Sequence, residues 1–112
     1  MNANELRIGN YYNYDSRPIK LDGGFLAMYL QNETDLYLEP ITLNEQWLLD
    51  FGFVKVDKMF EFWEGSVFNI ELINNHWCIC YTSNVLCTHI KHAHQLQNLY
   101  FALTGIELIK KL

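Results

Sequence analysis

The sequence predicts an α+β fold in which a curled antiparallel sheet, with a small barrel as one form it could take, packs with two helices. Three observations lead to this prediction. Short β-rich runs bounded by turn residues fill most of the chain, a capped helix signal stands near its middle, and an amphipathic stripe lies near its end. The length of 112 residues fits one domain, so we expect residues 1–112 to form a single α+β domain.

The first forty residues are expected to form strands joined by tight turns. Asp15–Pro18 is rich in turn-forming residues, and Asp22–Gly24 is typical of a hairpin turn. Apolar and aromatic residues with a preference for strands stand between these turns. Strands are therefore expected over residues 6–8, 11–14, 19–21, 25–30 and 36–39.

A short helix, capped at both ends, is predicted near residues 42–51. Thr42 and Glu45 have the spacing of a capping box, in which each side chain bonds the backbone amide of the other residue. Apolar residues at helical spacing follow, and Gly52 can adopt the left-handed conformation that ends a helix.

The second half of the chain predicts further strands and a final helix. Asn74–Asn75 separates two β-rich runs and is expected to form a hairpin turn. An amphipathic helix is predicted near residues 91–104, with Gly105 as its C-cap. Its apolar stripe has the i, i+3, i+4, i+7 spacing of one helical face and consists of Leu96, Leu99, Tyr100 and Leu103.

All cysteines and histidines of the chain fall between residues 76 and 94. They are His76, Cys78, Cys80, Cys87, His89, His92 and His94. Zinc takes about four nitrogen or sulfur ligands, but no Cys-x-x-Cys pair or zinc-finger spacing is present. We therefore expect reduced cysteines, with Cys78 and Cys80 as small core residues, and no metal or other cofactor. A metal-binding protein that uses this 76–94 cluster is kept as an alternative.

No motif for catalysis is present. Cys87 lies near His89 in the sequence, but no nucleophile elbow or orienting acid accompanies this pair. Gly23–Gly24 lacks the spacing of a phosphate-binding loop. We therefore expect no catalytic residues and no enzymatic activity.

The charge of the protein suggests a first binding surface. The formal net charge is −5, and residues 22–72 hold ten acidic side chains and two lysines, a net charge of −8. A region of this kind can dock on a basic partner surface. The predicted acidic patch consists of Glu33, Asp35, Asp57, Glu61 and Glu64.

A second candidate surface combines aromatic and basic residues near the N-terminus. Aromatic rings interleaved with basic groups can stack on single-stranded bases, and tyrosine and arginine are also frequent anchors in protein interfaces. The negative net charge opposes nucleic-acid binding as the main role, so RNA is a secondary partner here. This predicted tyrosine patch consists of Arg7, Tyr11, Tyr12, Tyr14 and Arg17.

The sequence shows no targeting segment. The first residues lack the basic and apolar regions of a secretory signal, and no run approaches the ~20 apolar residues of a membrane helix. We therefore expect a cytoplasmic protein without a membrane partner.

Three blocks of the sequence resemble small proteins encoded by phages, prophages and mobile elements of Bacteroidetes. These blocks are Asn4–Asn10, Pro40–Phe53 and His94–Gly105, and residues 54–90 contain no motif of this kind. The resemblance implies a phage setting, in which small proteins often bind a host protein. It further implies an inhibitor of bacterial defence, such as an anti-CRISPR protein that acts on a type VI-B effector nuclease in an infected or lysogenic bacterium.

These observations lead us to expect a non-enzymatic binding protein that docks on a defence nuclease. The guide-binding channel of such a nuclease must be positively charged, which gives the acidic patch an electrostatic reason to bind there. The alternative is an RNA-associated accessory protein that uses the tyrosine patch.

Overall fold

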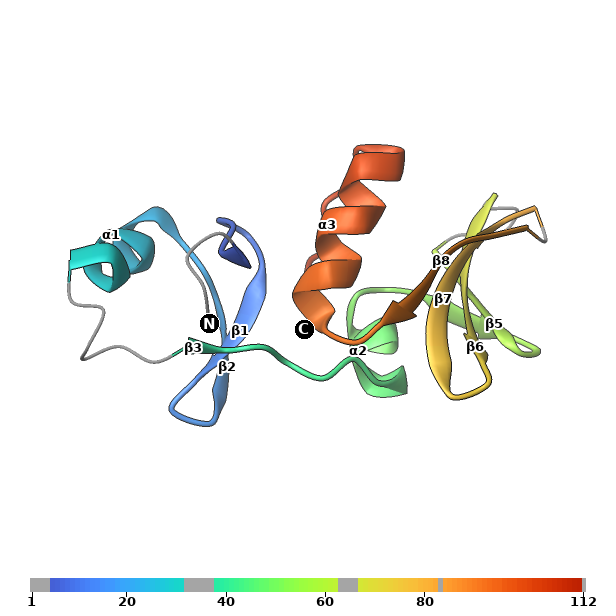
Figure 1. Ribbon diagram of the computed structural model, residues 1–112, viewed down its shortest axis with the longest axis horizontal. Helices are drawn as coiled ribbons and strands as arrows, with labels where there is room; N and C mark the ends of the chain where they lie inside the picture. Colours follow the sequence, from blue (N-terminus) through green and yellow to red (C-terminus); the bar gives the residue numbers. More distant parts are fainter. Residues whose placement is uncertain (1–4, 32–37, 63–66, 83, 112) are drawn as a thin grey trace. The chain divides into compact units, whose positions relative to one another are not determined.

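The computed structural model confirms the predicted α+β class (Figure 1). It describes residues 5–31, 38–62, 67–82 and 84–111, and in these ranges three helices and eight strands form two antiparallel sheets. Both sheets are open, so neither forms the small barrel that the strand pattern allowed. The chain divides into two compact units, and unit 2 is largely an insertion into unit 1. Unit 1 comprises Met1–Thr42 and His92–Glu107, and unit 2 comprises Leu43–Lys91 and Leu108–Leu112.

Unit 1 is built on a three-stranded sheet with the strand order β2-β1-β3. The predicted turn is confirmed at Asp15 and Ser16, which have positive φ angles of 52° and 64° and join β1 to β2 directly, whereas Arg17 and Pro18 belong to β2. The elements of this unit are β1 (Tyr11–Tyr14), β2 (Arg17–Lys20), α1 (Gly23–Gln31), β3 (Leu38–Glu39) and α3 (Ala93–Thr104).

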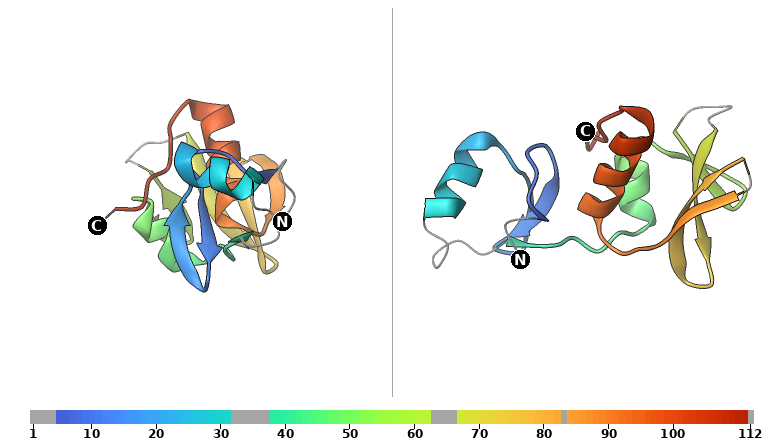
Figure 2. Two further views of the ribbon diagram at one scale, coloured as in Figure 1. Left: turned by 90° about the vertical axis from the view of Figure 1, so that its left-hand side faces the viewer. Right: turned by 45° about the horizontal axis from the view of Figure 1, so that its top comes forward.

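Helix α1 replaces the strand predicted over residues 25–30, and that prediction is wrong. Asp22 begins the helix, because its carboxylate accepts a hydrogen bond from Phe25 N at 2.8 Å and its carbonyl accepts one from Leu26 N at 3.0 Å. Asp22–Gly24 is therefore a helix start and not a hairpin turn. Phe25 and Leu26 pack against the buried cluster of unit 1, and Figure 2 shows α1 beside the β1–β2 hairpin. Tyr12, Leu21 and Leu38 form this cluster.

The strand predicted over residues 6–8 is also absent, because this segment enters a polar network with α3. The Arg7 guanidinium donates to Asn10 Oδ1 at 2.6 Å and to Asn98 Oδ1 at 3.1 Å, and it forms an ion pair with Glu107. The side chain of Asn10, which is fully buried, donates to Asn98 Oδ1 at 2.8 Å. Side chains of α3 and the Tyr12 hydroxyl on β1 thus hold the N-terminal segment in place of a strand ladder.

Gln97 on α3 satisfies the backbone of the same segment. Its Oε1 accepts a hydrogen bond from Tyr11 N at 2.9 Å, and its Nε2 donates to Gly9 O at 3.2 Å. The Gln97 side chain is fully buried, so these backbone groups would lose their partner in the protein interior without it. Helix α3 itself ends at Gly105, which has a φ angle of 76°, so the C-cap prediction is confirmed.

We expect Gln97→Leu to lower the free energy of unfolding by about 2–4 kcal/mol, because it removes the partner of a buried N–H and of a half-buried C=O. Chemical denaturation followed by circular dichroism measures the loss. Gln31→Leu is the matched control, since Gln31 is exposed at the end of α1, and its effect should stay within about 0.5 kcal/mol. Equal losses in the two variants would contradict the role given to Gln97.

His94 is a buried, uncharged residue of unit 1. Its ring lies 5.2 Å from the Tyr12 ring, and Nδ1 has no hydrogen-bond partner in the described part of the chain. Burial, aided by the neighbouring His92, lowers the pKa of His94 below its ordinary value of 6.5. The unfolded chain therefore binds a proton at a higher pH than the folded protein does.

This lowered pKa predicts that the free energy of unfolding falls as the pH decreases below 6.5. Well above that value His94 is neutral in both states and contributes no pH dependence. His94→Leu should reduce the slope of stability against pH, as measured by urea denaturation across this range. His92→Asn, which keeps a capping side chain at the start of α3, should retain most of the slope, because burial is the larger cause of the lowered pKa of His94.

Unit 2 contains a five-stranded sheet with the strand order β4-β5-β6-β7-β8. Asn74 and Asn75 have φ angles of 50° and 65° and join β6 to β7, as predicted. One face of the sheet supplies Phe60, Ile70 and Ile79 to a buried core that also includes residues of α2 and its flanks. The elements are α2 (Glu45–Asp50), β4 (Val54–Val56), β5 (Met59–Glu61), β6 (Phe68–Ile73), β7 (His76–Tyr81) and β8 (Asn84–Ile90).

Helix α2 confirms the predicted short helix but corrects its cap. Asn44 is the N-cap, and its Oδ1 accepts a hydrogen bond from Trp47 N at 2.9 Å. Thr42, predicted to cap the helix, instead pairs with His92 in an isolated antiparallel bridge. Gly52 follows the helix with a φ angle of 99°, so the predicted left-handed stop is confirmed.

Substitutions can show whether Asn44 or Thr42 caps helix α2. We expect Asn44→Ala to lower the free energy of unfolding by about 1 kcal/mol, because Trp47 N loses its acceptor. Thr42→Ala should change it by less than about 0.5 kcal/mol, since the Thr42 side chain is exposed and its bridge uses the backbone. Thermal or urea denaturation measures both values, and a larger loss at Thr42 would restore the predicted capping box.

Candidate functional site

The tyrosine patch is not formed as a surface. Tyr11 is 8% exposed and Tyr12 is fully buried, because β1 is the central strand of its sheet. The Tyr12 hydroxyl donates to Glu5 O at 2.7 Å, and the Tyr14 ring, which is half-buried, packs edge-on against Phe25. These rings are therefore part of the interior of unit 1 and are not presented for base stacking.

The basic members of that patch are separated in the structure. Arg7 is occupied by the network with α3 and also lies over the Phe101 ring, 4.9 Å from its centroid. Arg17 is exposed on β2, opposite Tyr14. Arg17 is therefore exposed to solvent, whereas Arg7 is held by contacts within unit 1, and the two arginines do not form a stacking surface with the tyrosines.

The acidic patch is represented by two of its five predicted members. Asp57 is exposed at the turn between β4 and β5, where its φ angle is 58°, and Glu61 is half-buried on β5. Glu33, Asp35 and Glu64 lie outside the described residues. Asp57 and Glu61 therefore place the predicted surface on the β4–β5 hairpin.

Strand pairing brings further residues to the same face of the sheet. Val54 lies opposite Glu61, Val56 lies opposite Met59, and Met59 in turn lies opposite Glu71 on β6. Directly paired residues of antiparallel strands point to the same face. We call these residues, together with Asp57 at the β4–β5 turn, the β4–β6 surface; it consists of Val54, Val56, Asp57, Met59, Glu61 and Glu71.

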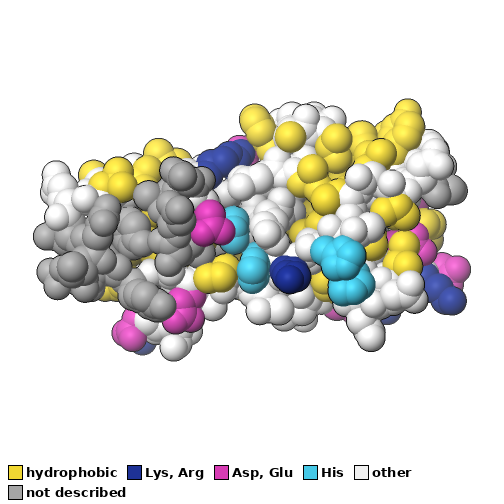
Figure 3. Space-filling view, viewed as in Figure 1, with side chains coloured by type: hydrophobic (Ala, Val, Ile, Leu, Met, Phe, Trp, Pro, Cys, Tyr) yellow, Lys and Arg dark blue, Asp and Glu magenta, His cyan; other side chains and the backbone are white. Residues whose placement is uncertain are grey.

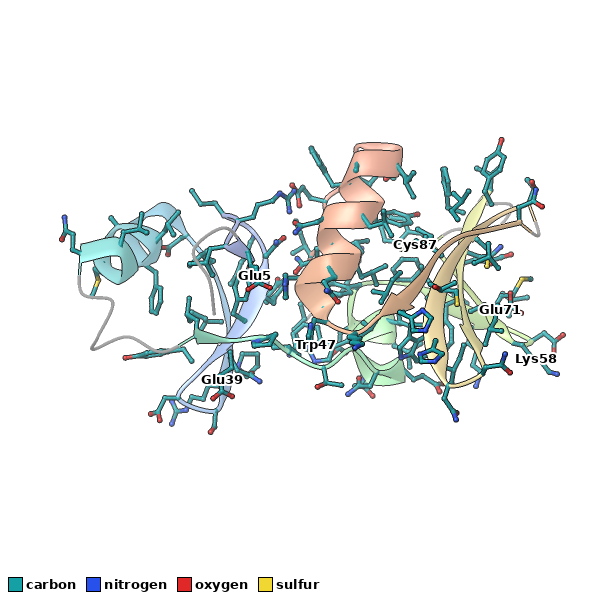
Figure 4. All side chains as sticks on the ribbon, in the orientation of Figure 1. Glu5, Glu39, Trp47, Lys58, Glu71 and Cys87 are labelled. Carbon is teal, nitrogen blue, oxygen red and sulfur yellow. The ribbon has the colours of Figure 1, made fainter. Side chains whose placement is uncertain are left out.

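The β4–β6 surface combines exposed apolar side chains with carboxylates. Val54 is 58% exposed and Val56 is 44% exposed, and Figure 4 labels Glu71 near the hairpin that carries Lys58. Val54 and Val56 form part of β4, an edge strand in which every residue is exposed. The apolar groups of these valines are exposed to water, and a binding partner could cover them.

Other acidic residues of unit 2 are neutralised within the unit. Glu45 pairs with Lys55 at 3.3 Å, and Asp50 pairs with Lys110 at 4.0 Å. Lys110 also lies over the Trp47 ring, 5.0 Å from its centroid. Lys110, from the C-terminal segment, thus offsets part of the charge that the sequence assigned to an acidic middle region.

The carboxylates of the β4–β6 surface lack such partners. Among the described residues, no ion pair involves Asp57, Glu61 or Glu71. Carboxylates accept hydrogen bonds and donate none, so this face favours a partner that supplies N–H groups.

The three cysteines are free thiols of unit 2. Cys78 and Cys80 are buried, as expected, and Cys87 is half-buried on β8. Burial, with the nearby charge of Glu71, raises the pKa of the Cys80 thiol and keeps it protonated at neutral pH. The Cys80 thiol donates weakly to Glu71 at 3.9 Å.

The 76–94 cluster is divided between the two units. His92 and His94 belong to unit 1, whereas His76, His89 and the cysteines belong to unit 2. Within the part of the chain that the structure describes, no three or more His, Cys, Asp or Glu side chains are grouped to hold a metal ion. The residues of the 76–94 cluster are therefore close in the sequence, but the described residues form no metal site of three or more ligands.

The sequence analysis missed Val54, Val56 and Glu71 as members of the surface. The alternation Val54-Lys55-Val56 was available as a signal, because period two places both valines on one face of a strand. Glu71 could not be joined to them without the register of β5 against β6, which pairs Met59 with Glu71.

The blocks that carry the phage resemblance supply internal contacts. Arg7 and Asn10 come from the first block, and Gln97 and Asn98 come from the last block. The middle block forms α2 and its caps. The residues on which the resemblance rests are thus largely structural in this chain, whereas β5 to β8 lie outside the three blocks.

No protein-family model, curated protein or solved structure matches the chain. None of the helices in the described ranges is long and apolar enough to cross a membrane.

Proposed function

We propose that the protein acts by binding another protein, with the β4–β6 surface as its docking site, and that this partner is a bacterial defence nuclease of the CRISPR type. The observation that supports the docking site is the row of exposed valines beside carboxylates that form no ion pair within the described residues. The phage resemblance supports the class of partner.

The composition of this surface favours a basic protein partner. Apolar area contributes affinity when it is covered, and the carboxylates of Asp57, Glu61 and Glu71 select a surface that carries Lys or Arg. The nucleic-acid channel of a CRISPR nuclease is a surface of that kind. Occupying it would exclude RNA and inhibit the nuclease without any catalytic step.

Side-chain docking fits this edge better than strand addition does. Strand β4 contains three residues and carries Lys55, and short strands with lysine are typical of edges that resist pairing with another strand. The partner would therefore be recognised by the face of the hairpin and by its charge.

The charge requirement can be tested with Asp57→Asn combined with Glu61→Lys. Surface plasmon resonance with a purified, guide-loaded type VI-B effector nuclease should show association about tenfold slower than for the unaltered protein. The rate of the unaltered protein should also fall as the salt concentration rises. Cleavage of target RNA should be inhibited by the unaltered protein and much less by the variant.

The matched control is Asp15→Asn combined with Glu39→Lys. It makes the same change in net charge in unit 1, and Asp15 and Asp57 both occupy turn positions with positive φ, where Asn is tolerated. The control should associate at the original rate. Equal slowing of both variants would reject the β4–β6 surface, and absence of binding and inhibition would reject this nuclease as the partner.

A further inference from the structure

Two exposed histidines of unit 2 lie against each other across neighbouring strands. The ring centroids of His76 on β7 and His89 on β8 are 3.8 Å apart, with an angle of 41° between the ring planes. Both residues are exposed, and Figure 3 shows a compact group of histidine side chains on the surface over these strands. Two imidazoles are thus held together where solutes can reach them.

A β-bulge places His89 in this position. Trp77 pairs with Ile90 and Ile79 pairs with Cys87, so β7 contributes one residue between these pairs where β8 contributes two, Thr88 and His89. His89 has a φ angle of 63°, which is uncommon for a residue other than glycine. The local backbone therefore adopts a less favourable conformation at the residue whose ring meets His76.

Thr88 orients the His89 ring. Its Oγ1 lies 2.6 Å from His89 Nδ1. When Thr88 Oγ1 accepts a hydrogen bond from Nδ1–H, the lone pair of His89 remains on Nε2. Hydrogen bonding of one ring nitrogen in this way is what fixes metal-binding histidines in other proteins.

We propose that His76 and His89 form a binding site for a divalent late first-row transition-metal ion such as Zn²⁺. Neutral imidazole is a preferred ligand of these ions, and the two rings come from strands whose pairing limits their separation. The pair would supply two of the four ligands that zinc usually takes, and water or groups of another molecule would supply the rest. This site is separate from the β4–β6 surface, so the proposal stands independently of the proposed function.

The test is a Zn²⁺ titration of the untagged protein, followed by two-dimensional ¹⁵N–¹H NMR of the histidine rings. We expect saturable binding of one Zn²⁺ and coordination shifts at one nitrogen of His76 and at Nε2 of His89. Mg²⁺ at the same concentration should leave these signals unchanged, because it prefers oxygen ligands. Thr88→Val should weaken Zn²⁺ binding about tenfold or more, because it removes the hydrogen bond that orients the His89 ring.

Variants of the ligands separate this site from the other histidines. His76→Gln and His89→Asn should each abolish saturable binding, and Asn suits the left-handed backbone at position 89. His92→Asn is the control and should bind Zn²⁺ as the unaltered protein does. Unchanged affinity in His76→Gln and His89→Asn, coordination shifts at His92 and His94, or no saturable binding would each overturn the proposal. If a variant fails to fold by circular dichroism, the ring signals of the unaltered protein decide the outcome.

Discussion

Unit 1 depends on hydrogen bonds between α3 and the N-terminal segment, two parts of the chain that lie far apart in the sequence. Gln97 is 86 residues from Tyr11 in the chain, yet its side-chain oxygen accepts the backbone N–H of that residue. Asn98 does the same for the side chains of Arg7 and Asn10. A buried polar network of this kind stabilises the fold only when each member has its partner, so the segment and the helix specify one another.

That constraint explains which parts of the fold could be predicted from the sequence. The turns at Asp15–Ser16 and Asn74–Asn75 and the stop at Gly105 depend on local backbone conformation, and local residue types indicate them well. Helix α1 was missed because its apolar run follows two glycines and carries no charge, so the capping role of Asp22 was the one local signal that distinguished it from a strand. The shift of the α2 cap from Thr42 to Asn44 has a similar cause, since Thr42 is taken up by its bridge to His92.

The candidate site was less predictable because it depends on strand register and charge pairing. Asp57 and Glu61 were grouped from the sequence by their charge alone; the pairing of β4 with β5 puts them on one hairpin, and Glu71 joins them only through the pairing of β5 with β6. The acidic character of the middle region is also reduced by Lys110, which comes from the far end of the chain. Burial of Tyr11 and Tyr12 likewise follows from tertiary packing, because aromatic residues suit both a core and an interface.

The bridge between Thr42 and His92 has a consequence for how such a protein can diversify. Residues 41–43 and 91–93 run side by side: Ala93 N donates to Ile41 O at 2.8 Å, and Leu43 N donates to Lys91 O at 2.8 Å. The segment between them therefore begins and ends at neighbouring points, as the insertions that domains tolerate usually do. Hairpins in this segment can be lengthened, shortened or recharged while the ends of the insertion stay in place. Such changes to the exposed strands of unit 2 would leave the buried network around α3 untouched, because that network lies within unit 1.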